Sequence, residues 1–183
     1  MKTYDFTLES HLWTKDNIEC PYELLKWLIE LADIEYFQEQ LRNYCCYTLS
    51  HKMYDKISAS EVIYDATVLQ SIFKAGYRIY LKPKKFYKKG LTISEITEEE
   101  LKKIKYLNED EYKNPYIVLE NIFNRFTIEQ VNKSFFDLIL ATMADSKYQK
   151  DYCCNVSMLN FHKMLDACKL IQQRDKNNFI LAF

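Results

Sequence analysis

The chain has 183 residues, of which 48% are hydrophobic and 28% charged, and its formal net charge is −1. This composition disfavours a disordered chain, which has fewer apolar residues and more net charge, and it gives no overall field that attracts nucleic acid or acidic membrane. With only 2 glycines and 3 prolines, a fold of tight β-hairpins is disfavoured, because such turns use glycine at positive φ.

The first strong pattern lies in residues 21–53, where apolar side chains recur at steps of three and four, the period of one face of an α-helix. Pro21 suits a first helical turn. Asp33 could cap a second segment, so we expect a long helix with a kink or short joint at 32–33. A stripe of this length is buried only against other long helices. Residues 1–19 alternate aromatic and polar positions at the start, which fits a short strand or an extended lead-in.

Capping boxes mark the starts of later helices, because the cap side chain and the Glu or Gln three residues on each bind a free backbone amide. The first box precedes a helical period that continues to Tyr80. Ala75-Gly76 within it either permits a close backbone approach or ends the helix, in which case residues 77–81 form a short strand. The boxes are Ser58–Glu61, Thr92–Glu95, Thr97–Glu100 and Thr127–Gln130.

The second half of the chain reads as a series of shorter helices. We expect a helix after Thr97 with inward-facing residues at 101, 104 and 107, an acidic loop over 108–114, and a helix that starts at Asn114-Pro115. The last helix runs from about Val156 to Arg174. The whole pattern predicts an all-α antiparallel bundle of about five to seven helices, with a minor strand or an extended segment at the N-terminus.

The segment 82–90 is the clearest break in composition, since it contains Pro83, Gly90 and five lysines. We expect a solvent-exposed connection. Residues 1–183 are expected to form one helical domain, with this segment as the candidate boundary between subdomains. Lysines interleaved with aromatic residues can also bind phosphates and stack on bases, although the acidic stretch 95–111 could neutralise them. The candidate nucleic-acid-binding residues are Lys84, Lys85, Phe86, Tyr87, Lys88 and Lys89.

Two similar segments contain a Tyr-Cys-Cys triplet followed by histidine, beginning at Tyr44 and at Tyr152. Thiolates and imidazoles from two helices could bind zinc. Adjacent cysteines on a helix point about 100° apart, so at most one of each pair would face a given metal. Core packing is the favoured interpretation, because cysteine is an ordinary buried residue. The candidate metal ligands are Cys45, Cys46, His51, Cys153, Cys154 and His162.

Several catalytic signatures are missing from the sequence: a glycine-rich phosphate loop, G-x-S-x-G, Glu-x-x-His and C-x-x-C. The N-terminus does not resemble a signal peptide. We therefore expect a non-enzymatic cytoplasmic protein, without cofactor or membrane span, which acts through protein–protein interaction with an unknown partner. A nucleic-acid-binding regulator and a Cys/His metal or redox protein are the alternatives, and a homo-oligomer is left open. The expected partner-binding residues lie in the apolar tail and are Phe179, Ile180, Leu181 and Phe183.

Overall fold

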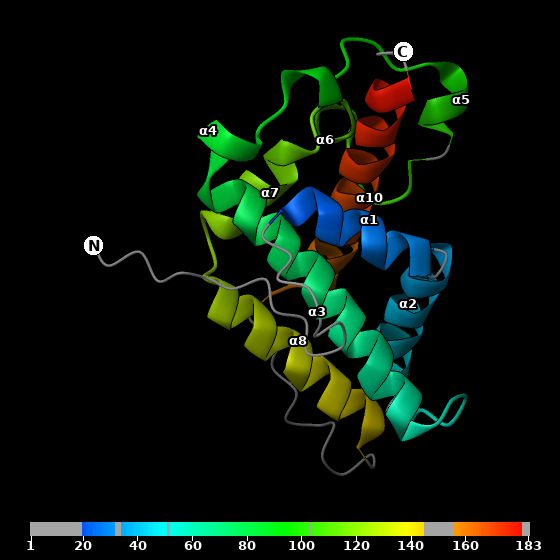
Figure 1. The fold of residues 1–183 in the computed structure, drawn as a ribbon. Helices are drawn as coiled ribbons and strands as arrows, with labels where there is room; N and C mark the ends of the chain where they lie inside the picture. The colour runs from blue at the N-terminus through cyan, green and yellow to red at the C-terminus, as the bar shows by residue number, and fades with distance from the viewer. Residues whose placement is uncertain (1–19, 32–33, 51, 103, 145–155, 181–183) are drawn as a thin grey trace, which may run out of the picture.

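Helices form all the regular structure in the residues that the computed structural model describes, which are 20–31, 34–50, 52–102, 104–144 and 156–180 (Figure 1). They are α1 (Pro21–Leu31), α2 (Ile34–Ser50), α3 (Ala59–Leu81), α4 (Pro83–Phe86), the 3₁₀ helix η1 (Lys89–Leu91), α5 (Glu98–Leu101), α6 (Glu109–Lys113), α7 (Tyr116–Phe123), α8 (Ile128–Met143) and α10 (Met158–Ile180). The all-α prediction is confirmed, and the strand considered for 77–81 is wrong, because α3 continues through it. The predicted N-terminal segment, residues 1–19, lies outside the described ranges.

Three of the predicted capping boxes start helices. The hydroxyls of Ser58, Thr97 and Thr127 each accept a hydrogen bond at 3.3 Å from the backbone N–H three residues later. In each case the Glu or Gln at that later position accepts from the backbone N–H of the cap residue, at 2.8 to 2.9 Å. These bonds satisfy amides that a helix start leaves without intrahelical partners, and so they set the first residues of α3, α5 and α8.

Three local predictions after the basic segment are wrong, and short-range hydrogen bonds explain two of them. The Thr92 hydroxyl donates to the Lys89 carbonyl at 2.7 Å, so it closes η1 and does not cap a new helix. Asn108 Oδ1 accepts from the Glu111 N–H at 2.8 Å, so α6 forms where the acidic loop was expected. Leu101 is exposed, because α5 ends there and the predicted helix does not extend to 107.

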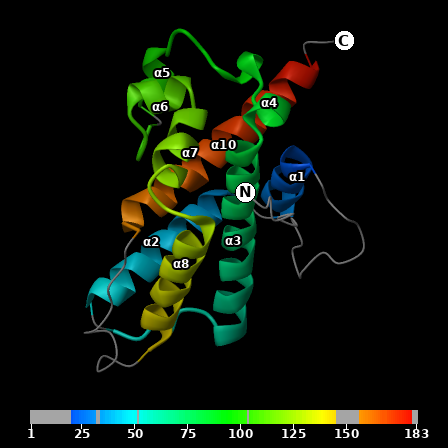
Figure 2. The ribbon, with the colours of Figure 1, turned by 90° about the vertical axis from the view of Figure 1, so that its left-hand side faces the viewer.

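Helix α3 is central to the bundle, since it packs against α1, α7, α8 and α10 (Figures 1 and 2). Helix α8 runs antiparallel to it. The Tyr54 N–H, just before α3, donates to the Thr142 carbonyl at 3.0 Å, while Tyr77 near the other end of α3 meets Phe123 edge-on at 4.9 Å. The amphipathic stripe of 21–53 is divided between α1 and α2. Helix α1 packs on α3, whereas α2 packs mainly on α8 and α10, so the stripe is buried against long helices as predicted.

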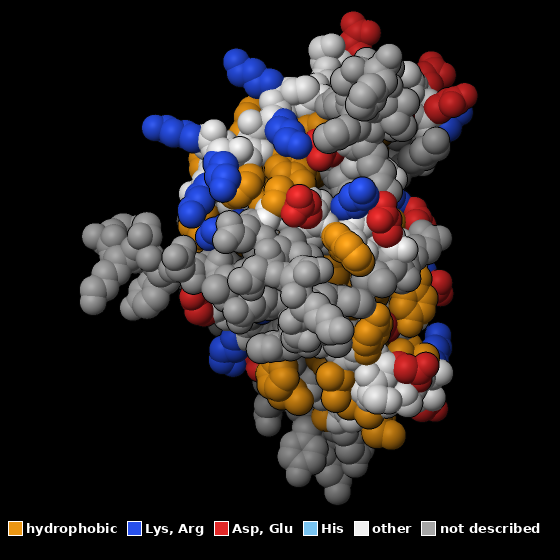
Figure 3. All heavy atoms as spheres, in the orientation of Figure 1, with side chains coloured by type: hydrophobic (Ala, Val, Ile, Leu, Met, Phe, Trp, Pro, Cys, Tyr) orange, Lys and Arg blue, Asp and Glu red, His pale blue; other side chains and the backbone are white. Residues whose placement is uncertain are grey.

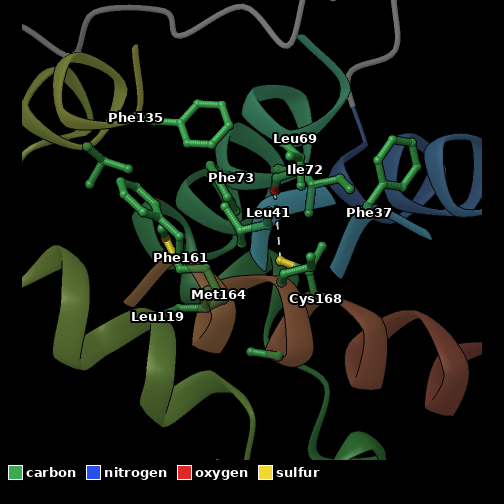
Figure 4. Close-up of a cluster of buried hydrophobic side chains, with 14 of the residues drawn as sticks. Phe37, Leu41, Leu69, Ile72, Phe73, Leu119, Phe135, Phe161, Met164 and Cys168 are labelled. Carbon is green, nitrogen blue, oxygen red and sulfur yellow. Dashed lines mark hydrogen bonds between the residues drawn. The ribbon is translucent and has the colours of Figure 1, made fainter. Parts of the chain in front are cut away.

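Three phenylalanines join the long helices at the middle of the core (Figure 4). The Phe73 ring of α3 stacks on Phe161 of α10, with centroids 5.6 Å apart, and meets Phe135 of α8 edge-on at 5.4 Å. Phe135 and Phe161 lie 5.4 Å apart. Stacked and edge-on pairs of this kind add about 0.5–1.5 kcal/mol each beyond the buried area, so this trio helps to fix how α3, α8 and α10 cross.

Gly76 allows α3 to approach two neighbouring helices closely. A Cβ atom at this position would lie 3.1 Å from Leu119 Cδ2 of α7 and 3.2 Å from Cys168 Sγ of α10. The Cys168 thiol in turn donates to the Ile72 carbonyl at 3.8 Å (Figure 4). The close approach expected at Ala75-Gly76 is therefore confirmed, and the glycine serves packing between helices without ending α3.

Buried residues on both sides of segment 82–90 belong to one hydrophobic cluster, which includes Phe73 before the segment and Phe135 and Phe161 after it. The organisation of the chain as one domain stays a prediction. Helix α10 reaches Ile180, six residues beyond the predicted end at Arg174. Among the described residues, none of the helices combines the length and the hydropathy that crossing a bilayer requires.

Candidate binding groove beside the basic segment

Segment 82–90 folds back onto the bundle through Phe86. Pro83 occupies the first turn of α4, where a missing N–H is tolerated. The Phe86 side chain is only 5% exposed, and its ring lies 6.5 Å from that of Tyr22 on α1. The Tyr22 hydroxyl donates to the Phe86 carbonyl. Phe86 therefore anchors the segment, and its ring faces the core.

A chain of hydrogen bonds continues from this anchor. The Lys88 N–H donates to the Tyr116 hydroxyl at 3.2 Å, and the Tyr116 and Tyr22 hydroxyls lie 2.7 Å apart. Because a phenol has one proton and that of Tyr22 goes to Phe86, Tyr116 donates to Tyr22. Burial raises the pKa of both phenols, so they keep the protons that this chain uses.

Helix α10 supplies the other support of the segment. Lys88 Nζ lies 2.6 Å from Asp175 Oδ1 and 4.1 Å from the centroid of the Tyr22 ring. The neighbouring Arg174 donates to three carbonyls, those of Leu91 at 2.9 Å, Lys113 at 3.1 Å and Tyr112 at 2.7 Å. The chain just after the segment is thereby tied to α6 and α10, and Lys88 is committed to a structural ion pair.

Beside the anchored segment lies a groove of about 240 Å³ with aromatic walls. The Tyr87 ring packs at a tilt against the Tyr116 ring, with centroids 4.5 Å apart. The Tyr80 hydroxyl donates to Asn124 Oδ1 at 2.8 Å. Of these side chains, only Tyr87 belongs to the predicted site. The lining residues are Ile79, Tyr80, Pro83, Tyr87, Tyr116, Leu119, Glu120 and Asn124.

Four lysines belong to the segment that contributes Pro83 and Tyr87 to the groove, and all four are exposed: Lys82, Lys84, Lys85 and Lys89. None of the four forms an ion pair within the described part of the chain, where Lys88 is the only lysine of the segment that does. Figure 3 shows blue side chains gathered beside hydrophobic ones where α4 lies, while red ones gather towards α5. The tyrosine groove thus lies next to a lysine-rich segment, while the one charged side chain in its own lining is Glu120.

The candidate metal ligands are only partly described. Cys45 is buried in the core cluster, whereas the adjacent Cys46 is exposed, as their spacing on a helix requires. Within the described ranges, no group of three or more His, Cys, Asp and Glu side chains could hold a metal. His51, Cys153 and Cys154 lie outside those ranges, so the metal site stays a prediction.

His162 is the one candidate metal ligand of the C-terminal segment that the structure describes. Its ring stacks on Tyr106, with centroids 4.2 Å apart and an interplanar angle of 14°. Burial lowers the pKa of this imidazole to about 4, so it is neutral at pH 7. His162 therefore acts as a buried, uncharged ring at the base of the 104–107 segment.

Exposed apolar side chains on α1, α2 and α3 form a surface on which another protein could bind. Figure 3 shows hydrophobic side chains gathered over α1, α2 and the N-terminal half of α3. Large exposed side chains on these helices include Trp27 (58% exposed), Tyr36, Ile63 and Tyr64. Phe179 and Ile180 of the predicted tail form the end of α10 and their side chains are not described; Leu181 and Phe183 lie outside the described ranges.

Local signals found the basic segment and Tyr87 but missed most of the groove. Tyr80 and Tyr116 come from α3 and α7, and no short-range pattern marks two tyrosines as neighbours of a third. Comparison of the chain with protein-family models, with curated proteins and with solved structures finds no match.

Proposed function

We propose that the protein is a non-enzymatic binding protein that holds a short stretch of single-stranded nucleic acid at the tyrosine groove. The observation that carries this proposal is the groove itself, because Tyr80 and Tyr87 are in its lining and Tyr87 belongs to a segment with four exposed lysines that lack ion-pair partners in the described structure. Stacking of a base on an aromatic ring contributes about 1–3 kcal/mol. Lysines bind the backbone phosphates by releasing counterions.

The size of the groove favours a strand over a small ligand. Its volume of about 240 Å³ is below the roughly 300–1,000 Å³ of pockets that enclose drug-sized molecules. A ligand that binds here extends beyond the groove, as a strand does when one base enters and the flanking phosphates lie along Lys84, Lys85 and Lys89. The net charge of −1 does not prevent a strand from binding, because salt limits the range over which each charge acts to roughly 8–10 Å at physiological ionic strength.

The anchoring of the segment supports the same proposal. The hydrogen-bond chain through Tyr22 and Tyr116, together with the Lys88–Asp175 pair, holds Tyr87 in place before any ligand binds. A preorganised aromatic ring loses little conformational entropy on binding. The groove is therefore ready to stack without rearrangement of α4.

Fluorescence anisotropy with labelled oligo(dT), oligo(U) and a DNA duplex tests this function. The combined substitutions Lys84→Glu, Lys85→Glu and Lys89→Glu reverse the charge of three exposed lysines of the segment, and they should abolish binding of the single strands. The same reversal at Lys133 on α8 should have little effect. For the wild type, the slope of log affinity against log salt should be about −0.7 for each lysine that contacts a phosphate.

Tyr87 variants separate stacking from charge. Tyr87→Ala should weaken binding about 5- to 150-fold, the equivalent of one lost stacking contact of about 1–3 kcal/mol, whereas Tyr87→Phe should retain it, because the ring remains. Tyr64→Ala, at an exposed tyrosine on another face, is the matched control. Binding that is independent of salt, or unchanged in both the Tyr87→Ala and the triple lysine variant, would refute the proposal.

Protein–protein interaction is the second candidate function, and the apolar surface of Trp27, Tyr36, Ile63 and Tyr64 favours it. Tryptophan and tyrosine are enriched among residues that dominate binding energy at interfaces. Sedimentation of the wild type and of Trp27→Ala tests self-association. Affinity capture with the wild type and with Trp27→Ala tests for binding to a different protein, which the wild type should retain and the variant should not. The cytoplasmic setting stays a prediction.

A further inference from the structure

A second concave site lies on the other side of α10, separate from the tyrosine groove. It is a cleft of about 620 Å³ between α2, α10 and the segment from α5 to α6, and this volume is within the range of small-molecule sites. Its walls contain equal numbers of acidic and basic side chains. The lining residues are Glu35, Gln38, Glu100, Lys102, Ile104, Lys105, Leu107, Tyr112, Asp166, Lys169, Leu170 and Gln173.

The wall formed by the two long helices has its charges held in fixed positions. Asp166 and Lys169, three residues apart, lie on one face of α10. Gln38 Nε2 of α2 donates to Asp166 Oδ1, and Lys169 Nζ forms an ion pair with Glu35. Glu35 thus compensates Lys169, while Asp166 accepts hydrogen bonds from two neutral groups, the Gln38 amide and the Tyr106 backbone N–H.

The opposite wall presents positive charge over an apolar floor. Lys102 and Lys105 are exposed, and neither forms an ion pair in the described residues. The apolar part of the lining consists of Ile104 and Leu107 from the same segment and Leu170 from α10. Glu100 is already used, because its carboxylate caps α5 and accepts from the Tyr112 hydroxyl at 3.3 Å.

The surroundings of Asp166 disfavour the charged form of its carboxyl group. Burial raises the pKa of this group to about 6, although the hydrogen bond from Gln38 and the charges of Lys169 and Lys105 act in the opposite direction. A perturbed carboxyl group in a cleft is a common feature of functional sites. A ligand that brings a cation to Asp166 would relieve this cost.

We propose that this cleft binds a small zwitterion of the α-amino acid class with an apolar side chain. The ligand ammonium donates to Asp166, the ligand carboxylate lies against Lys105 and Lys102, and the apolar side chain covers Ile104, Leu107 and Leu170. Both charged ends are needed, because the hydrogen-bond donors of Asp166 are neutral groups and Lys102 and Lys105 form no ion pair in the described residues. The site does not depend on the tyrosine groove.

Isothermal titration with leucine and its two single-charge analogues tests this inference on the full chain. 3-Methylbutylamine keeps the ammonium and the side chain, and 4-methylpentanoate keeps the carboxylate and the side chain. Leucine should bind at least tenfold more tightly than either analogue. Absence of heat with leucine at millimolar concentration, or equal binding of either analogue, would overturn the proposal.

Two substitutions locate the binding. Asp166→Asn keeps the side-chain shape and an acceptor for Gln38, and it should weaken the affinity for leucine at least tenfold. Lys105→Gln should also weaken this affinity at least tenfold, and it leaves α10 unchanged. Asp137→Asn and Lys133→Gln, an exposed ion pair on α8, are the matched controls. Leucine affinity unchanged in both Asp166→Asn and Lys105→Gln would place the ligand elsewhere and refute the site.

Discussion

Removing the charge of Asp166 should make the protein more stable at neutral pH. The native state holds this carboxyl group with a pKa of about 6, against an ordinary value of 3.8, and burial is the main cause. Because the folded pKa is the higher one, the native state binds the proton more tightly than the unfolded chain. This contribution to stability is fully present below about pH 4 and is lost as pH rises through 6.

The magnitude follows from the shift. A difference of roughly 2 pKa units corresponds to about 3 kcal/mol at 1.36 kcal/mol per unit. Asp166 is partly exposed, and solvent screening reduces this figure, so we expect Asp166→Asn to raise the free energy of unfolding by about 1–2 kcal/mol at pH 7. Asparagine retains an oxygen that accepts from Gln38, so this hydrogen bond is kept.

Urea unfolding of both proteins between about pH 4 and pH 8 measures the effect. The difference between them should be largest above pH 6 and should become small towards pH 4, because Asp166 is then protonated in the native state and partly protonated in the unfolded state. Asp137→Asn should change the free energy of unfolding by less than about 0.5 kcal/mol, since its ion pair is exposed. An Asp166→Asn protein that is less stable than wild type at pH 7 would show that Lys105 and Lys169 outweigh desolvation, and would refute the reasoning.

His162 gives the opposite pH dependence: its pKa is lowered to about 4 by burial, so it stabilises the fold above pH 6.5 and destabilises it as pH falls through 4. His162→Gln should therefore flatten the acid side of the stability profile measured by urea unfolding. Phe73→Ala should lower the free energy of unfolding by about 3–5 kcal/mol, whereas Phe136→Ala, at an exposed position of α8, should change it by less than about 0.5 kcal/mol. Gly76→Val should cost about 1–3 kcal/mol through overpacking against α7 and α10, and Gly76→Ala less, because alanine gains up to about 1 kcal/mol of helix propensity; near-equal melting temperatures of the Val and Ala proteins would contradict this.

Much of the fold is encoded locally and could be predicted. The caps at Ser58, Thr97 and Thr127 act within four residues, and the periods of α3 and α8 are properties of single helices. Prediction failed where two local options compete. The Thr92 hydroxyl bonds backwards to Lys89, and the Asn108 box outweighs an acidic, loop-like composition. Such choices differ by little free energy, and tertiary contacts decide between them.

The candidate sites were less predictable, because their residues meet only through packing. Tyr80 and Tyr87 are only seven residues apart, but Tyr116 of α7 is 29 residues beyond Tyr87, and no local period connects it to them. In the sequence, nothing distinguishes Asp166 from the other polar residues of the last helix, where apolar and polar positions alternate irregularly. Its neighbour Gln38 lies 128 residues away, and neither residue belongs to a short motif that could have linked them.

The contacts that α10 makes with the basic segment have a consequence for the order of folding. Asp175 binds Lys88 from 87 residues away, and Arg174 reaches the Leu91 carbonyl from 83 residues away. Contacts of such sequence separation form late, because a long loop must close before they are gained. During synthesis, α3 and α4 leave the ribosome well before α10 exists. The ion pair and the hydrogen bond by which α10 supports the basic segment therefore form only after α10 has been synthesised.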